Sequence, residues 1–144
     1  MAIADVMTTR VVQAGPDETV RTAARLMSQA GVGSVAVCEG ARLVGILTER
    51  DVLGFVGRGA DLDRTLTRDA MTRRLVTAAP DDDILGVARL MRDRHVRHLP
   101  VVEGENLLGM IGIRDVLSAL TEALWQSRDE AVHETARDLL SSQS

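Results

Sequence analysis

The chain repeats itself, and this duplication constrains its fold more than any other feature of the sequence. When the sequence is shifted by 64 residues it aligns with itself without a gap, and 22 of the 49 positions between 5–53 and 69–117 are identical. Unrelated segments of this length would share only a few residues. The chain is therefore expected to contain two similar packing units, and each copy is best interpreted together with the other.

Each copy has the pattern of one βαββα unit. In the first copy a short apolar stretch at Val11–Val12 predicts a strand that ends before Pro16, which cannot donate a hydrogen bond to a sheet. Thr19 is a favourable helix N-cap. The residues after it have the spacing of one apolar helix face: Val20, Ala23, Ala24 and Met27. Two apolar runs around a Glu39–Gly40 turn then predict a strand hairpin.

The second copy predicts the same elements 64 residues later, with Leu75–Val76 in its first strand and Asp83 as its N-cap. A second helix is expected to begin near Thr48 in one copy and near Gly112 in the other. The predicted fold class is therefore α/β, more narrowly α+β. Two βαββα units should pack sheet to sheet around a pseudo-twofold axis.

The pattern divides the chain into four segments. We expect the first unit over residues 1–56, a polar linker over 57–68, the second unit over 69–120, and a C-terminal helix with its tail over 121–144. The stretch Ser118–Leu140 is rich in Ala, Leu, Glu and Arg, which are good helix formers, and it predicts one long helix.

Composition excludes several classes of protein. The chain has one Trp, one Phe and no Tyr, so its core is expected to be aliphatic. A formal net charge of −4 argues against sequence-independent binding to nucleic acid, which needs a dominant basic surface. Cys38 is the only cysteine, which excludes an internal disulfide and favours a reducing compartment. No signal peptide or bilayer-spanning apolar run is visible, so we expect a cytoplasmic protein without membrane contact.

Three kinds of stretch in the duplicated sequence have a recognisable pattern. They are the openings Asp5–Thr8 and Asp69–Thr72, the stretch Gly45–Val52 and the stretch Arg97–Val102. Together they resemble the CBS-domain pair, also called the Bateman module, over most of the chain. The resemblance implies the tandem βαββα fold and a stand-alone bacterial protein with no attached enzyme or channel. It also implies a homodimer in which four units form a flat disc.

Thr48 and Asp51 have two interpretations. A threonine at the N-cap with an acid three residues later predicts a capping box, in which each side chain satisfies a backbone N–H group at the helix start. The resemblance implies a second role, in which these two side chains hold the ribose hydroxyls of a bound nucleotide. In the second copy Gly112 replaces the threonine. The resemblance still makes Arg114 and Asp115 candidate ligand-binding residues there, in an incomplete site.

Arg97 and His98 lie at the predicted start of a strand, where the resemblance implies contact with phosphate. Arginine suits phosphate because its planar guanidinium presents a fixed fork of donors. Cations at a helix C-terminus also interact favourably with the helix dipole. That alternative accounts for Arg92 and Arg94, but it accounts poorly for Arg97 and His98, which should lie beyond the helix.

Two further candidate roles follow from residue type. The resemblance places Val12 and Val76 beside an adenine ring, although an ordinary core position is the simpler interpretation. His95 and His98 are three residues apart, but a closed metal site would need carboxylates as well, and no metal site is predicted. The sequence has no recognisable nucleophile–base set or phosphate-cradling glycine loop, so no enzymatic activity is predicted.

The combined prediction is a regulatory module that binds an adenine nucleotide in the cleft between its two units. AMP or ATP is expected first, and NAD or S-adenosylmethionine next, with no cofactor required. Binding should signal through a change of conformation or assembly. The alternative is a structural or protein-interaction scaffold with degenerate ligand sites and an unidentified protein partner, which Gly112 favours.

Overall fold

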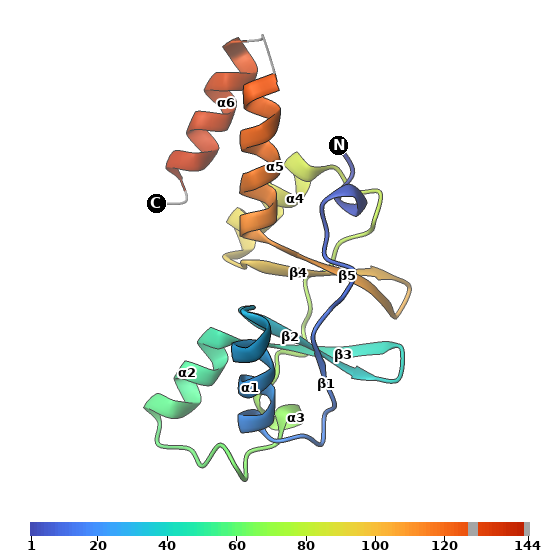
Figure 1. The fold of residues 1–144 in the computed structure, drawn as a ribbon, viewed down its shortest axis with the longest axis vertical. Helices are drawn as coiled ribbons and strands as arrows, with labels where there is room; N and C mark the ends of the chain where they lie inside the picture. Colours follow the sequence, from blue (N-terminus) through green and yellow to red (C-terminus); the bar gives the residue numbers. More distant parts are fainter. Residues whose placement is uncertain (127–129, 143–144) are drawn as a thin grey trace.

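The computed structural model describes residues 1–126 and 130–142, and its elements follow the duplicated order (Figure 1). A 3-10 helix η1 (Ile3–Asp5) comes first. The first repeat then contains β1 (Gln13–Ala14), α1 (Val20–Ala30), β2 (Ser34–Glu39), β3 (Arg42–Thr48) and α2 (Glu49–Gly57). The second repeat contains α3 (Thr67–Ala70), α4 (Ile84–Arg94), β4 (His98–Glu103), β5 (Asn106–Gly112) and α5 (Ile113–Gln126), and α6 (Glu130–Ser141) follows. The predicted mixed α+β fold class is confirmed.

The strand hairpins of the two repeats are built alike. β2 pairs antiparallel with β3 starting from Ser34 and Thr48, and β4 pairs with β5 starting from His98 and Gly112. Corresponding residues differ by 64 along the whole length of both hairpins, and each hairpin has a register shift at the same step. The sequence repeat is therefore also a structural repeat.

The two hairpins join through their turn ends. A single residue pair connects β3 to β5, so the strands form one five-stranded sheet in the order β1-β2-β3-β5-β4. Two hydrogen bonds flank this pair, because Leu43 N–H donates to Glu105 O (3.0 Å) and Leu107 N–H donates to Ala41 O (3.2 Å). Their residues are related by 64, as a pseudo-twofold axis requires. The sheets predicted to be separate are thus continuous at one point.

The first strands are shorter than predicted. Val11–Val12 and Leu75–Val76 lie outside them, since β1 covers Gln13–Ala14 and its counterpart is a single bridge between Ala78 and Val101. In the first repeat the strand pairing extends further because Ala36 N–H donates to the Val12 carbonyl (3.0 Å). The equivalent of Ala36 is Pro100, which has no N–H to donate, so the second repeat loses this hydrogen bond.

The opening segment of each repeat packs on the other repeat. Thr8 exchanges two backbone hydrogen bonds with Met110, and Thr72 exchanges the equivalent two with Ile46. Ile3, in η1, is fully buried in the core of the second repeat. The packing units therefore differ from the sequence repeats by an exchange of their first residues, and this exchange ties the two repeats together.

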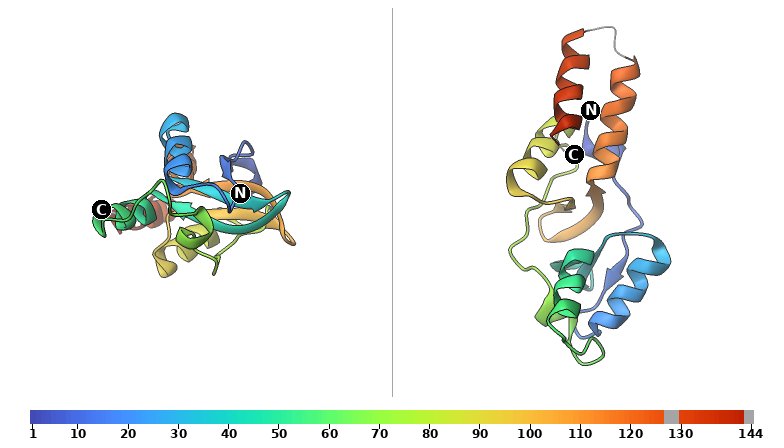
Figure 2. Two further views of the ribbon diagram at one scale, coloured as in Figure 1. Left: turned by 90° about the horizontal axis from the view of Figure 1, so that it is seen from below. Right: turned by 90° about the vertical axis from the view of Figure 1, so that its left-hand side faces the viewer.

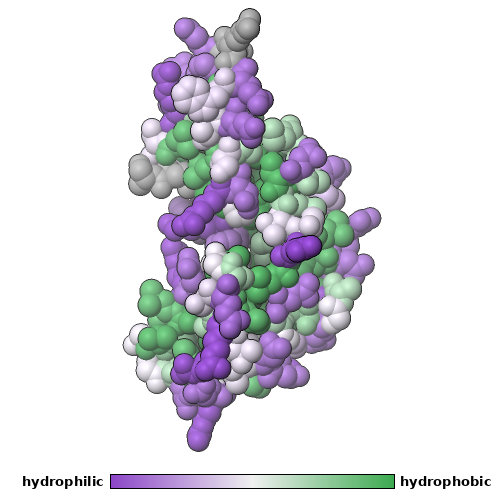
Figure 3. Space-filling view, viewed as in Figure 1, coloured by the Kyte–Doolittle hydropathy of each residue, from purple (hydrophilic) through white to green (hydrophobic). Residues whose placement is uncertain are grey.

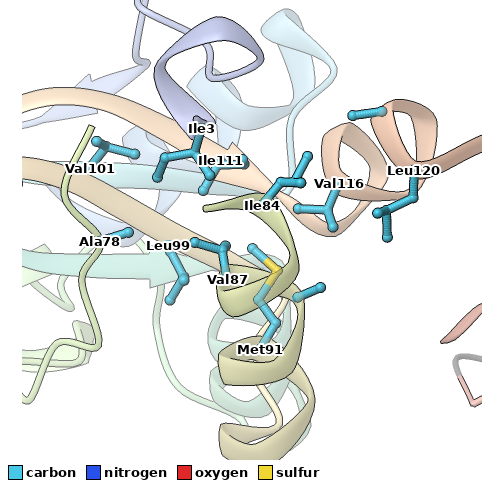
Figure 4. Close-up of a cluster of buried hydrophobic side chains, with 12 residues drawn as sticks. Ile3, Ala78, Ile84, Val87, Met91, Leu99, Val101, Ile111, Val116 and Leu120 are labelled. Carbon is cyan, nitrogen blue, oxygen red and sulfur yellow. The ribbon is translucent and has the colours of Figure 1, made fainter. Parts of the chain in front are cut away.

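Aliphatic side chains fill the buried clusters, as the composition predicts. The core of the second repeat brings together side chains from η1, α4, both strands of its hairpin and α5 (Figure 4). The first repeat has a corresponding cluster around Val20, Val35 and Leu47. A third cluster lies between the hairpins and consists of Ala36, Cys38, Ile46 and Met110. This last cluster holds the two repeats face to face.

The C-terminal region contains two helices where the sequence predicts one. α6 packs back along α5 (Figures 1 and 2), and residues 127–129 of the predicted helix lie outside the described residues. Ala136 is 5% exposed, and Leu139 packs against the core of the second repeat. One straight helix would carry these apolar side chains away from the core, so their burial favours the reversal.

Candidate functional site

A cleft of about 230 Å³ lies between the two repeats, and we call it the inter-repeat cleft. The wall from the first repeat consists of Gly33, Ile46, Thr48, Glu49, Arg50 and Asp51. The wall from the second repeat consists of Thr72, Arg74, Leu75, Val76, His95, Val96, Arg97, His98 and Pro100. A larger hollow of about 530 Å³ runs along α5, but α5 alone lines it and Glu122 is its one charged side chain. The inter-repeat cleft is therefore the better candidate for a ligand site.

Five of the eight residues that the sequence proposes for ligand binding line this cleft: Thr48, Asp51, Val76, Arg97 and His98. The other three are not among its lining residues. Arg114 and Asp115 lie at the equivalent start of α5, and Val12 packs against the core of the first repeat. Val76 both lines the cleft and packs against the core of the second repeat.

Thr48 and Asp51 form the predicted capping box at the start of α2. Thr48 N–H donates to Asp51 Oδ2 (2.9 Å), and Asp51 N–H donates to Thr48 Oγ1 (3.2 Å). Within the described residues the second carboxylate oxygen, Oδ1, accepts no hydrogen bond. The helix start thus holds both side chains in one orientation and leaves the Oδ1 atom of Asp51 able to accept hydrogen bonds from a ligand.

The start of α5 retains half of this arrangement. Gly112 N–H donates to Asp115 Oδ2 (3.0 Å), but Gly112 has no hydroxyl to return the bond. The carboxylate is therefore held in the same way in both repeats, while the hydroxyl is present in the first repeat alone.

The inter-repeat cleft is rich in cationic side chains. Arg50, Arg74 and Arg97 line it, and none of them forms an ion pair within residues 1–126 and 130–142. Arg92, in the last turn of α4, instead pairs with Asp93 (3.1 Å). Because α4 ends at residue 94, the helix-dipole explanation does not extend to Arg97. Several guanidinium groups without anionic partners at one cleft favour an anionic ligand.

His98 is the partly buried basic side chain of the cleft. Burial lowers the pKa of His98 below its ordinary value because it penalises the charged ring. The nearby carboxylates of Glu49 and Asp115 act in the opposite direction, while the Arg97 guanidinium adds to the lowering. The ring is therefore mostly neutral at neutral pH, and an added anion beside it would favour protonation.

His95 has an unusual backbone conformation at the edge of the cleft. It is the C-cap of α4 with φ 54° and ψ 40°, in the left-handed region. The equivalent C-cap of α1 is Gly31, with φ 65°, which adopts this conformation without steric cost. A non-glycine residue in this region is uncommon, and such residues occur often at functional sites.

Sequence reasoning missed three charged residues of the cleft, Glu49, Arg50 and Arg74. Glu49 and Arg50 lie inside the stretch that carries the family resemblance, directly between Thr48 and Asp51. Arg74 belongs to the opening segment of the second repeat and reaches the cleft because that segment packs on the first repeat. The signal that could have identified Arg74 is its identity with Arg10 in the repeat alignment.

Other kinds of site find no support in the described part of the chain. Among these residues no group of three or more His, Cys, Asp or Glu side chains is arranged to hold a metal ion. None of the described helices has the length and apolar character needed to cross a membrane. Burial raises the pKa of the Cys38 thiol, which makes it a poor nucleophile at neutral pH.

Comparison with known proteins agrees with the motifs and the fold. The family described as "CBS domain" matches the chain twice, over residues 3–58 and 67–122. The chain belongs to the CBS-domain family. CBS-domain pairs are regulatory modules, and the two matched ranges together cover most of this chain.

Individual relatives have the same organisation. The CBS domain-containing protein YhcV of Bacillus subtilis is 34% identical over 116 residues, which are 80% of this chain and 82% of that protein. The structure of the CBS-domain containing protein ATU1752 from Agrobacterium tumefaciens is 30% identical, covers 83% of this chain and 98% of its own, and has a TM-score of 0.76. Four other relatives are longer, and the chain spans 33–61% of their lengths.

The similar structures include ligand complexes. The CBS-domain pair of protein MJ0100 was solved in complex with 5′-methylthioadenosine and S-adenosyl-L-methionine. It superposes with a TM-score of 0.77 over 85% of this chain and 97% of its own, at 22% identity. Identity at this level shows a shared fold.

Proposed function

We propose that the inter-repeat cleft binds an adenine nucleotide and that the protein reports the bound nucleotide through the arrangement of its repeats or its assembly. One observation carries this proposal. The cleft combines arginines that have no ion-pair partner in the described chain with a hydroxyl and a carboxylate held by the capping box. Binding partners for an anion and for a diol therefore lie in one cleft, and a nucleotide contains both groups.

The proposed contacts follow from the chemistry of each wall. The ribose hydroxyls would donate to the Oδ1 atom of Asp51, and Thr48 would contribute its hydroxyl beside them. Arg97 and Arg74 would contact phosphate, for which the guanidinium fork is well suited. The cleft lining has no Phe, Tyr or Trp side chain to stack on a base, so the adenine would pack on aliphatic side chains such as Val76.

The charge of the cleft orders the ligand candidates. AMP and ATP carry phosphate groups that match Arg50, Arg74 and Arg97, and NAD carries a diphosphate. S-adenosylmethionine carries a sulfonium cation, which these three arginines would repel. The complex of MJ0100 supports an adenosine-type ligand in this fold. The arginines of this chain favour a ligand that adds phosphate to that adenosine.

The proposed signal depends on the position of the cleft. Its walls come from both repeats, so a ligand that bridges them favours the arrangement in which both walls are in contact. A ligand can shift a conformational equilibrium only by its difference in affinity for the two states. The nucleotide would therefore stabilise one arrangement of the repeats, and a partner that recognises this arrangement would respond.

We also propose that the chain forms a homodimer. Leu53 and Val56 on α2 are 70% and 53% exposed, and Trp125 on α5 is 83% exposed. Figure 3 shows apolar side chains gathered over α2 at the lower left of the molecule. Exposed apolar residues that cluster in this way favour a protein interface. The same surface supports the scaffold alternative, in which the protein acts by binding a protein partner and the cleft binds no ligand.

The proposal is tested by thermal unfolding with AMP, ADP, ATP, NAD and S-adenosylmethionine. A nucleotide at about 100 times its dissociation constant should stabilise the fold by about 2.7 kcal/mol. We expect the phosphate-bearing ligands to stabilise the protein and S-adenosylmethionine to have the weakest effect. If none of the five ligands stabilises the protein, the scaffold function is favoured over nucleotide binding.

Substitution of Asp51 separates the ligand contact from the cap. Asp51→Ala removes a charge-assisted hydrogen bond and should weaken nucleotide binding by about 1.5–3 kcal/mol. Asp51→Asn is the matched control for stability, because its amide oxygen can still accept the Thr48 N–H bond. Both variants should lose affinity in calorimetric titration, while Asp51→Asn should keep most of its stability. A loss of stability with no loss of affinity would leave Asp51 as a helix cap alone.

A further inference from the structure

The two repeats differ at the first residue of the hairpin strand that lies beside each capping carboxylate. Beside Asp51 the first hairpin begins with Ser34, which is 6% exposed. Beside Asp115 the second hairpin begins with His98, the residue equivalent to Ser34. Since the hairpins have the same register, Ser34 and His98 occupy equivalent backbone positions. A small side chain in one repeat is thus replaced by a large ring in the other.

Two glycines make room for the His98 ring. A Cβ atom added to Gly33 would lie 3.2 Å from His98 Cε1, and one added to Gly112 would lie 3.6 Å from His98 Cδ2. The ring therefore lies between a glycine of the first repeat and a glycine of the second. In the repeat alignment Gly33 corresponds to Arg97 and Gly112 corresponds to Thr48. The position beside Asp115 has thus lost both the cation and the hydroxyl that the position beside Asp51 has.

The carboxylate of Asp115 also interacts with the His98 ring. Electrostatic interaction couples His98 to Asp115 and to Glu49, and Asp115 Oδ2 lies 3.6 Å from a Cβ atom added to Gly112, on the same side as the ring. A ribose that approached Asp115 would have to compete with the ring for space and for the carboxylate. Asp51, in contrast, lines the inter-repeat cleft, and the residue equivalent to His98 in its repeat is the smaller Ser34.

We propose that His98 makes the two equivalent positions unequal, so that each chain binds one nucleotide beside Asp51 and none beside Asp115. This inference rests on the proposed nucleotide binding in the inter-repeat cleft. His98 then determines specificity in two ways. Its ring excludes a ligand from the second position, and its exposed edge lines the first position beside Arg97. A symmetric sequence duplication would become a protein with a single nucleotide site.

The first test compares two carboxylates with equivalent caps. AMP is titrated by calorimetry into the wild-type protein, Asp51→Ala and Asp115→Ala at about pH 8, where His98 is neutral in each protein and its charge does not change the comparison. We expect one AMP per chain and a loss of affinity of about 10- to 150-fold in Asp51→Ala. Asp115→Ala should bind AMP as the wild type does. Thermal unfolding of both variants provides the control for folding.

The outcomes separate this inference from the proposed function. Wild-type protein that binds no nucleotide would overturn the proposed function itself. Two equal AMP sites per chain, or loss of AMP binding in Asp115→Ala, would overturn the role of His98 and leave nucleotide binding intact. One AMP per chain that depends on Asp51 alone supports the inference.

The second test rebuilds the missing site from the chain's own first repeat. The triple substitution His98→Ser, Gly112→Thr and Gly33→Arg gives the second position the residues found at Ser34, Thr48 and Arg97. In this folded variant we expect two AMP molecules per chain, and a further Asp51→Ala change should abolish one of them. A folded triple variant that still binds a single AMP would refute the exclusion by His98. If the variant does not fold, the comparison of the two carboxylates decides the matter alone.

Discussion

The crossing of the two opening segments over the hairpins leads to a quantitative prediction about glycines. Gly109 lies beneath the first opening segment, and a Cβ atom added to it would lie 2.7 Å from Met7 Sδ and 2.8 Å from the backbone oxygen of Thr8. Gly45 lies beneath the second, where an added Cβ would overlap Met71 Sδ and lie 3.1 Å from the backbone oxygen of Thr72. Methionine side chains are flexible and can repack, whereas the backbone oxygens are held by the strand-like pairing.

Gly109→Ala should therefore be more costly than Gly45→Ala. Overpacking costs about 1–3 kcal/mol. The backbone of Thr8 can move away only by weakening its two hydrogen bonds with Met110, each worth about 1 kcal/mol. We expect Gly109→Ala to lower the free energy of unfolding by about 2–4 kcal/mol, and Gly45→Ala by about 1–2 kcal/mol. Urea unfolding followed by circular dichroism measures both values.

Removal of the methionines distinguishes the two crossings. In a Met71→Ala background, Gly45→Ala should cost little, because the nearest remaining atom is a backbone oxygen at a distance that a small shift relieves. In a Met7→Ala background, Gly109→Ala should remain destabilising, because the Thr8 oxygen is still too close. Double-mutant cycles report this difference as a coupling energy.

An exposed helical glycine is the matched control. A Cβ atom added to Gly86, in α4, meets no atom within 4 Å, so Gly86→Ala should raise the free energy of unfolding by about 0.5–1 kcal/mol. If Gly109→Ala and Gly86→Ala have the same effect, the opening segment does not cross the hairpin as closely as the structure shows, and the reasoning fails.

Three further predictions concern the cleft and the assembly. Arg97→Ala should weaken ATP binding more than adenosine binding, and the difference should shrink as salt rises because the attraction is screened; equal losses for both ligands in calorimetry would exclude a phosphate contact. The pKa of His98 is lowered in the folded protein, so the unfolded chain binds more protons, and stability of the free protein should fall as pH decreases through about 6.5. Bound phosphate favours the charged ring, so ATP affinity should instead rise as pH decreases over the same range. His98→Asn should flatten the pH dependence of both stability and ATP affinity. If both pH dependences are unchanged in that variant, they belong to other groups. Sedimentation of the wild-type protein should show a dimer. Leu53→Asp should produce monomers, while the control Leu85→Asp, at a less exposed position of α4, should remain dimeric. A wild-type monomer at micromolar concentration would refute the proposed dimer.

The caps and hairpins are the elements that local sequence patterns predicted well. Thr19 and Asp83 accept hydrogen bonds at the starts of α1 and α4, and Thr48 and Asp51 form the predicted box. Such features depend on residues within one helical turn or one tight turn, so their spacing in the sequence is sufficient. The 64-residue repeat supported these predictions further, because the sequence pattern of each element occurs twice in the chain.

The position of the cleft residues depended on contacts that no local pattern contains. Arg74 lines the same cleft as Thr48 because the opening segment of the second repeat crosses to pair with Ile46. Nothing in the spacing of residues 72–76 indicates this crossing. It is favoured by the burial of Ile3 in the core of the second repeat and by the packing of Ala70 and Met71 against the core of the first, which are properties of the whole fold.

By itself the sequence determined the duplicated α+β fold, the family, and five of the residues that line the cleft. The tertiary structure alone decided which repeat provides each wall, that the tail reverses along α5, and that the His98 ring lies between Gly33 and Gly112. The physical reason is range. Helix caps, turns and hairpin registers are set by interactions between neighbours in the chain. A cleft between repeats is set by packing between segments that are far apart in the sequence. Each such contact closes a long loop, and the entropy cost of closing it must be offset by burial elsewhere in the fold.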